Sequence, residues 1–431
     1  MRARTGILTT FVSAMCALTT PGAAAQTVTW WNQGEAAVGA FSDEVAEGFA
    51  EAEAQAGLSA APQLYPNEAY KTVLQVAVGA GNEPDVFFNW GGEGTFRFAR
   101  ANKLHDLTEA AAQAGVPKPL LAPYSPDGER AYGFPLTQHT VAFLYNEDLF
   151  ARFGVAPPQT LAELASVCRA IRAADPDAIP ISFGAKEPWT IIHYLTMLFQ
   201  RHVPAEVRRD DDALRTDADA IYTHPGYVQG LKALRGLQDA GCFNRGINSV
   251  TPEEARAFFA LEISAMTFCG TWCLDPVDQA GLAGRYGLFP MPGVPGGAGD
   301  QTAVFVVPEG FNVSAKSADP EAAEALVAYI FSAEVQAKMV RDLGRIPVNA
   351  DALALVETSE VFADAVRLTA NAPSTVLSAD MSMDFAVGRE LGTAAQTFVN
   401  GQATAEEVMA SVRDTALRIK RRRTRLAGAD G

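Results

Sequence analysis

The residues best suited to binding chemistry in this chain are its five tryptophans. Each follows or ends a predicted strand and has turn residues close by, and strand ends are where open α/β sheets place ligand crevices. A flat indole face can cover the apolar C–H face of a sugar ring, while neighbouring amides and carboxylates bind its hydroxyls. Side chains alternate along a strand, so either Trp30 or Trp31 is expected in the core. The set therefore predicts a carbohydrate-binding cleft: Trp30, Trp31, Trp90, Trp189 and Trp272.

Signatures of catalysis are absent from the sequence. It contains no G-x-S-x-G elbow, no H-E-x-x-H, no phosphate loop and no G-x-G-x-x-G. The five histidines are scattered, and His193, which has apolar neighbours, is expected to be structural. The acidic pair Asp380 and Asp384 leaves one enzymatic alternative, a secreted carbohydrate-active enzyme that uses Asp380 or Glu35. The prediction is a non-catalytic protein without cofactor or metal.

The first 25 residues have the three-part layout of a secretory signal. A positive start with Arg2 and Arg4 precedes an apolar stretch and small residues, which predicts cleavage after Ala25 and export to the periplasm. Losing the signal changes the formal charge from −16 to −18. Such an acidic surface argues against binding to nucleic acid and to anionic membranes. The basic run RIKRRRTR (418–425) is the exception, and we expect it to be a frayed, solvated tail.

Four cysteines lie after the predicted signal. Their even number and the oxidising compartment favour one or two disulfides, with Cys242 expected to pair with Cys269 or Cys273. No histidine lies near the Cys-x3-Cys spacing in sequence, so a metal site is not expected there. The remaining cysteine is Cys168.

Predicted strands alternate with predicted helices along the whole chain. Capping boxes at Thr160–Glu163 and Thr251–Glu254 each mark a helix start, and Asp319 is expected to cap another. Continuous apolar strands alternating with helices indicate an α/β protein with largely parallel sheets. About 400 mature residues exceed one core, so two lobes are expected. The predicted strands include 27–31, 62–65, 84–88, 141–145 and 179–183.

Four segments together resemble the extracellular solute-binding proteins of sugar ABC transporters, the group that includes maltose-binding proteins. The segments are AYKTVLQVAVGAGNEPDVFFNW (69–90), YGFPLTQHTVAFLYNEDLFARFGVAPPQTLAEL (132–164), FFALEISAMTFCGTW (258–272) and FSAEVQAKMVRDLGRIPVN (331–349). The resemblance implies two α/β lobes, a multi-segment hinge and a ligand cleft between the lobes. It also implies a monomer that delivers a carbohydrate to the permease subunits of an ABC importer. A receptor for a non-sugar solute such as a polyamine remains an alternative.

The resemblance further implies lobe boundaries and site residues. The N-lobe is expected at 26–138 and 302–345, and the C-lobe at 139–301 and 346–431. Gly270 would let the chain turn past the cleft and present Trp272 to ligand, with the cysteines bracing this segment. The expected ligand-binding residues are Trp31, Asn32, Glu35, Asn89 and Trp90 from the N-lobe, Trp189 and Trp272 from the C-lobe, Phe311, Asn312 and Arg345 near the hinge, and Asp380.

Overall fold

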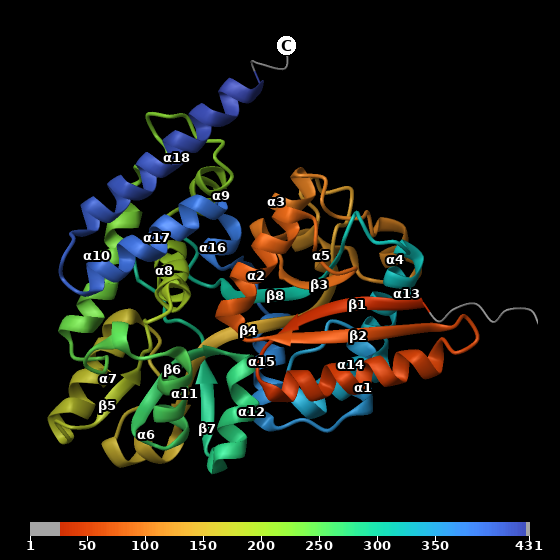
Figure 1. The fold of residues 1–431 in the computed structure, drawn as a ribbon. Coiled ribbons are helices and arrows are strands. Elements are labelled where there is room, and N and C mark those ends of the chain that lie inside the picture. Colours follow the sequence, from red (N-terminus) through yellow and green to blue (C-terminus); the bar gives the residue numbers. More distant parts are fainter. Residues whose placement is uncertain (1–25, 428–431) are drawn as a thin grey trace, which may run out of the picture.

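The computed structural model describes residues 26–427 (Figure 1). The predicted signal segment, with its cleavage site after Ala25, lies outside the described residues. Among the helices that the structure describes, none is both long and apolar enough to cross a bilayer.

One connected sheet passes through the middle of the molecule. Its main path has the order β2-β1-β3-β8-β4-β6-β5, with β7 paired to β4 and β9 to β8. The strands are β1 (Gln26–Gln33), β2 (Leu58–Tyr65), β3 (Val86–Trp90), β4 (Phe134–Asn146), β5 (Ile179–Ser182), β6 (Ser264–Gly270), β7 (Tyr286–Phe289), β8 (Val304–Val313) and β9 (Thr375–Leu377).

The expectation of largely parallel sheets is wrong. Pairings β1–β2, β1–β3, β5–β6 and β8–β9 are parallel, whereas β8 runs antiparallel to both β3 and β4, and β4 runs antiparallel to β6 and β7. The physical reason is that β4 and β8 carry the chain between the lobes in opposite directions. Every residue of β8 is buried, so its apolar run looks like a parallel core strand.

The fold is the two-lobed α/β arrangement, with β4 and β8 crossing between the lobes. One large buried cluster, the N-lobe core, draws on residues within 28–136 and 311–348. A second, the C-lobe core, draws on residues within 141–307 and 376–416. Each core thus combines segments that are far apart in sequence. The four lobe boundaries given above stay a prediction.

Helices cover the sheet on both faces, as the alternating pattern suggests. Both capping boxes are confirmed, at Thr160–Glu163 and Thr251–Glu254, and Asp319 caps its helix. The helices are α1 (Ala36–Ala52), α2 (Asn67–Ala80), α3 (Glu93–Arg100), α4 (Thr108–Gln113), α5 (Lys118–Leu121), α6 (Glu147–Phe153), α7 (Leu161–Ala174), α8 (Pro188–His202), α9 (Ala205–Asp212), α10 (Pro225–Asp239), α11 (Pro252–Ala260), α12 (Leu274–Val277), α13 (Pro320–Phe331), α14 (Ala333–Leu343), α15 (Glu360–Ala370), α16 (Ala379–Ser382), α17 (Phe385–Val399) and α18 (Ala405–Ala427).

The predicted pairing of Cys242 is wrong. Cys168 forms a disulfide with Cys242, and Cys269 forms one with Cys273. Cys168 lies on α7, and the Cys242 carbonyl accepts a hydrogen bond from the Ile181 amide of β5, so the sheet brings α7 and the end of α10 together. This contact depends on tertiary packing, which cysteine spacing does not reveal.

The predicted fraying of residues 418–425 is also wrong, because α18 continues as a helix through Ala427. Lys420 anchors this part of α18 by donating to the carbonyls of Leu214 and Thr216. Basic residues near a helix C-terminus also interact favourably with the helix dipole. The side chains of 421–425 are nevertheless exposed.

Candidate functional site

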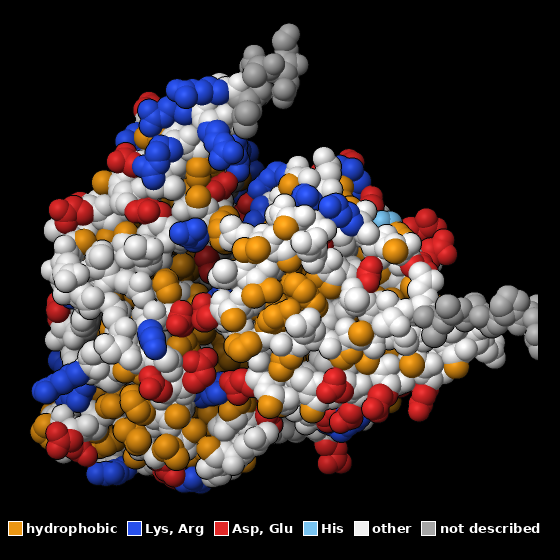
Figure 2. Space-filling model, in the orientation of Figure 1, with side chains coloured by type: hydrophobic (Ala, Val, Ile, Leu, Met, Phe, Trp, Pro, Cys, Tyr) orange, Lys and Arg blue, Asp and Glu red, His pale blue; other side chains and the backbone are white. Residues whose placement is uncertain are grey.

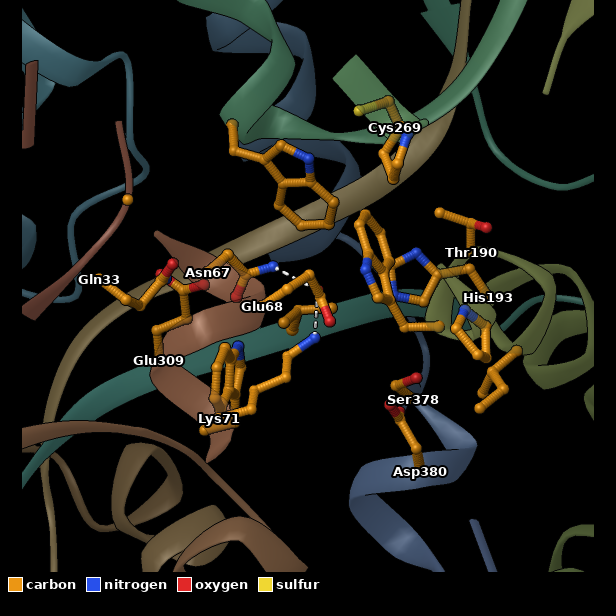
Figure 3. A pocket seen from close by; sticks show the side chains of 18 of the residues that line it. Gln33, Asn67, Glu68, Lys71, Thr190, His193, Cys269, Glu309, Ser378 and Asp380 are labelled. Atoms are coloured by element: carbon orange, nitrogen blue, oxygen red, sulfur yellow. Dashed lines mark hydrogen bonds and ion pairs between the residues drawn. The ribbon is translucent and has the colours of Figure 1, made fainter. Parts of the chain in front are cut away.

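A cleft of about 960 Å³ lies between the two lobes. The N-lobe lines it with the chain after β1, the start of α2 and the end of β3. The C-lobe lines it with the start of α8, the turn after β6, and α16. Figure 2 shows charged side chains of both signs around a hollow between the two halves, and Figure 3 shows the lining from close by. Its dimensions suit a small-molecule ligand.

Two tryptophans form the C-lobe wall. Trp189 stands in the first turn of α8, and Trp272 lies in the short 3-10 turn (Thr271–Cys273) directly after β6. Their ring centroids are 6.4 Å apart. The His193 ring packs against both indoles, with its centroid 5.0 Å from that of Trp189 and 5.9 Å from that of Trp272. The wall is therefore apolar and continuous.

The turn that presents Trp272 explains the local sequence. The Trp272 ring folds back over Gly270, where an added Cβ would come within 2.0 Å of the ring carbon Cζ3. Only glycine leaves room for that approach without moving the ring. The Cys269–Cys273 disulfide spans the same turn, and both cysteines line the cleft. Gly270 thus makes room for the tryptophan as well as for the turn.

The N-lobe contributes a third indole. Trp90 ends β3 and packs edge-on against Phe88 at 5.0 Å. Its neighbour Asn89 is buried, and the Asn89 amide donates to the Gly94 carbonyl and to the Asn312 side chain, each at 2.8 Å. Asn312 is buried behind the lining, so its contact with the site runs through Asn89. Asn89 and Trp90 themselves line the cleft.

Three other predicted residues lie in the N-lobe behind the lining. Trp31 packs against Tyr65 with 5.0 Å between ring centroids. Asn32 is buried and donates to the Ser42 hydroxyl. Phe311 packs on Trp30, which is the fully buried member of the tryptophan pair, as the alternation predicts that one of them would be. The chain reaches the cleft only at the next residues, which are Gln33, Gly34 and Glu35.

Glu35 reaches across the cleft to the C-lobe. Its carboxylate pairs with Arg256 of α11 at 2.9 Å. The Glu35 side chain is 62% exposed, so the pair contributes little to stability. Its importance is geometric, because it links the two lobes at the mouth of the cleft.

Sequence reasoning missed Lys71 and Glu68, on the first turns of α2. The Lys71 ammonium donates to Glu68 at 2.6 Å and lies 5.6 Å from the Trp90 ring and 5.9 Å from the Trp189 ring (Figure 3). Lys71 thus occupies space between indoles of opposite lobes. On the facing C-lobe, burial and the nearby Glu68 raise the pKa of Glu187. The i, i+3 spacing on α2 was visible in sequence, but which face of α2 meets the cleft was not.

A charged cluster lies at the base of the cleft, between the crossing strands. Glu309 on β8 contacts Arg345 at 3.5 Å and the Nε2 atom of His139 on β4 at 3.3 Å. Burial opposes ionisation of Glu309, yet His139 and Arg345 hold the pKa of its carboxyl below its usual range. Burial lowers the pKa of His139. The His139 ring also packs against Trp272 at 5.0 Å and so joins this cluster to the aromatic wall.

Six side-chain polar atoms of residues that line the cleft are buried without a hydrogen-bond partner within the described part of the chain. Two of them are Oδ1 of Asp380 and Nε1 of Trp189, and the others belong to Asn67, Arg97, Tyr194 and Ser378. Burial raises the pKa of Asp380. An unpartnered buried acceptor and donor are costly unless a ligand or water completes them. A sugar hydroxyl both donates and accepts, so it can pair with either of these two atoms.

The pH dependence of stability should reveal the buried state of His193. Burial, with a smaller contribution from Lys71, lowers the pKa of His193 to about 3. A histidine in the unfolded chain has a pKa of about 6.5, so it is protonated at a pH where the buried His193 is still neutral. The unfolded state therefore binds more protons, and the free energy of unfolding falls as the pH falls. Between about pH 7 and pH 5 we expect His193 to cost about 2 kcal/mol of unfolding free energy.

Chemical denaturation at the two pH values measures this loss. His193→Gln removes the titrating group and should reduce the difference between the two pH values by that amount. An unchanged pH difference in the variant would show that His193 has about the same pKa in the folded and the unfolded protein.

Comparisons with known proteins agree with this geometry. The model of the family described as bacterial extracellular solute-binding protein matches residues 32–337. The multiple sugar-binding protein of Streptococcus mutans is 25% identical over 278 residues, which are 62% of this chain and 63% of that protein. The melibiose/raffinose/stachyose-binding protein MelE of Bacillus subtilis is 20% identical over 233 residues, or 53% of each chain. The chain spans about half to two-thirds of the length of these curated relatives.

Solved structures share the fold over most of their length. One, from work on xylan utilization by Caldanaerobius polysaccharolyticus, has a TM-score of 0.82 at 20% identity and covers 90% of this chain and 99% of its own. A sugar transporter protein of Bacillus licheniformis in complex with stachyose has a TM-score of 0.73 at 17% identity, with 91% and 99% coverage. The family match extends over well more than half of the sequence, from β1 to α14. The chain therefore belongs to the bacterial extracellular solute-binding proteins.

Proposed function

We propose that this protein is the exported, monomeric substrate-binding component of an ABC importer. It binds a carbohydrate between its lobes and delivers it to the membrane permease. The observation that carries the proposal is the aromatic wall of Trp189 and Trp272 facing Trp90 across the cleft, with the unpartnered Asp380 Oδ1 and Trp189 Nε1 beside it. The indoles cover the apolar faces of sugar rings, and the unpartnered polar atoms bind sugar hydroxyls.

The other lining residues divide into supporting roles. Asn89 positions Trp90, because the Asn89 Oδ1 accepts a hydrogen bond from the Trp90 backbone amide. Glu35 and Arg345 lie at opposite depths, with Glu35 at the mouth and Arg345 at the base beside Glu309. Asn312 acts through Asn89, and Trp31, Asn32 and Phe311 support the N-lobe wall from behind. Closure of the lobes on a ligand would follow the hinge strands β4 and β8.

The charge of the lining favours a neutral ligand over a polyamine. Six carboxylates and five cationic side chains line the cleft, so neither sign dominates. A polyamine site would instead need an excess of carboxylates. The carboxylates are Glu35, Glu68, Glu253, Asp275, Glu309 and Asp380, and the cations are Lys71, Arg97, Arg256, Arg345 and Arg389.

The enzymatic alternative requires a free acid and base on either side of a glycosidic bond. Of the two candidates, Glu35 is exposed and ion-paired with Arg256, whereas Asp380 keeps a buried oxygen without a hydrogen-bond partner among the described residues. One free carboxylate supports binding of a hydroxyl but supplies half of a hydrolytic pair.

A heat-shift screen of the mature protein against mono- and oligosaccharides tests the proposal. A ligand at about 100 times its Kd adds about 2.7 kcal/mol of stability, which raises the melting temperature. We expect a shift with at least one sugar, no shift with spermidine, and no product in the incubated sugar by chromatography. Formation of a product would show that the protein is an enzyme. A shift with spermidine and with no sugar would show that it is a polyamine receptor.

A further inference from the structure

The end of α18 projects beyond the residues that pack on the C-lobe core, the last of which is Ile419. Buried side chains along this helix stop at Ala416, and all of residues 421–425 are exposed. Figure 1 shows α18 projecting past α9 and the body of the C-lobe. We call residues 418–425 the basic overhang. A helix end that buries no apolar surface gains nothing from core packing, so its sequence is free to serve another purpose.

The basic overhang concentrates one sign of charge. It holds six of the 34 Lys and Arg residues of the chain, and no acidic residue occurs between Asp414 and Asp430. Figure 2 shows these Lys and Arg side chains gathered over the end of α18. The helix dipole favours one or two cations in a last turn, but six like charges repel one another. The rest of the protein is acidic, so the overhang is an isolated basic projection.

Two side chains of the overhang, those of Lys420 and Arg423, contact other parts of the protein. Lys420 binds two backbone carbonyls, and Arg423 pairs with Asp384 at 2.7 Å. Arg421 donates only to the Leu417 carbonyl of its own helix. Arg422 and Arg425 contact no acceptor among the positions that the structure describes. Lys420 and Arg423 therefore fix the direction of the helix, while Arg421, Arg422 and Arg425 offer exposed guanidinium groups.

We propose that the basic overhang binds the anionic phospholipid surface of the membrane. The inference rests on the proposed function, because delivery to a permease brings this protein to a membrane. Guanidinium groups form paired hydrogen bonds with phosphate oxygens, and clusters of four to eight Lys and Arg residues are typical of anionic lipid binding. The overhang has no hollow and no aromatic side chain, which suits a diffuse layer of headgroups better than a shaped protein partner.

The overhang can act despite the acidic body. Charges separated by more than a Debye length, about 8 Å at physiological salt, are largely screened from one another. The helix advances about 1.5 Å per residue, so its exposed turn lies several ångströms beyond the last buried contact. The tip therefore reaches the headgroups while much of the repulsion between body and membrane is screened. The expectation of repulsion from anionic membranes, drawn from net charge, would then hold for the body but not for this segment.

Co-sedimentation of the mature protein with lipid vesicles tests the proposal. We expect binding to phosphatidylcholine vesicles that contain phosphatidylglycerol, no binding to phosphatidylcholine alone, and release in high salt. A variant with four neutralised arginines should lose at least about tenfold in vesicle affinity. It spares Lys420 and Arg423, which hold the helix in place, and consists of Arg418→Gln, Arg421→Gln, Arg422→Gln and Arg425→Gln.

A matched variant controls for net charge. It removes four exposed cations elsewhere, Lys118→Gln, Arg130→Gln, Arg152→Gln and Arg169→Gln, and should bind vesicles like the unmodified protein. Absence of vesicle binding by the unmodified protein, or equal losses in both variants, would overturn the proposal. A third outcome would also overturn the proposal: the overhang variant loses permease-dependent uptake although the unmodified protein does not bind vesicles. The overhang would then bind an acidic protein surface. The sugar heat shift is measured separately, so failure of the proposed function is distinguishable.

Discussion

Replacing Cys168 and Cys242 together by alanine is expected to lower the free energy of unfolding by about 4 kcal/mol. The disulfide closes a chain segment with a sequence separation of 74 residues, and loop-closure entropy grows with that length. Both cysteines are fully buried between α7 and the end of α10, so the native state loses packing as well. Denaturant unfolding of the exported, oxidised protein measures the loss.

The second disulfide provides the matched control. Cys269 and Cys273 are only four residues apart, and the same entropy relation gives about 2 kcal/mol for so short a loop. The double alanine variant at these positions should therefore melt well above the Cys168/Cys242 variant. Equal destabilisation by the two variants would contradict the role assigned to the long loop. Both variants should still bind the sugar, the second more weakly because it loosens the turn that holds Trp272.

The parts of the site that could be predicted from sequence are those fixed by local structure. Trp90 and Trp272 were placed in the cleft because a strand end projects its last side chains beyond the sheet. Trp189 follows a predicted strand, and the resemblance to the family implies its place in the cleft. Asp380 was expected to bind hydroxyls, and the structure leaves one of its oxygens without a partner. For Trp90 and Trp272 the signal is contained in a few adjacent residues, whereas the roles of Trp189 and Asp380 are implied by the resemblance.

The other features of the site depend on interactions between distant segments. Asn312 and Phe311 lie on β8, which is buried on both faces, so the sequence could not tell which side meets the cleft. Lys71 lies on α2 and reaches the cleft only because the C-lobe faces that helix. His193 was interpreted as structural; it is buried among aromatic rings and also lines the cleft.

Prediction of the fold from sequence is likewise limited to what neighbouring residues determine. The strands, helices and capping residues follow from local patterns. Most predicted strands lie within about four residues of those in the structure, but β4 begins at Phe134, seven residues before the predicted strand 141–145. Strand direction does not follow from such patterns, since a buried antiparallel strand and a buried parallel strand have the same apolar run. The antiparallel pairing of β4 with β8 arises from the route of the chain between lobes, which only the assembled fold defines.

Trp272→Ala should weaken sugar binding by about one to two decades. Stacking on an aromatic ring contributes roughly 1–3 kcal/mol in base–aromatic contacts, a scale we apply to a sugar ring, and 1.4 kcal/mol is about tenfold in Kd. The Trp272 side chain is half-buried at the cleft, so its removal leaves both lobe cores intact. Calorimetry of melting and of sugar titration on the same variant separates the two effects.

Two further variants make the assignment specific. Trp30→Ala removes a fully buried indole from the N-lobe core and should cost about 3–5 kcal/mol of stability, so a similar cost for Trp272→Ala would show that Trp272 serves packing and not binding. Gly270→Ala keeps the indole but places a methyl group where the Trp272 ring lies. The ring must then move, and sugar affinity should fall nearly as far as in Trp272→Ala. Unchanged affinity in Gly270→Ala would mean that the orientation of the Trp272 ring does not matter for the ligand. A matching loss would show that the G-T-W turn exists to hold one ring against the sugar.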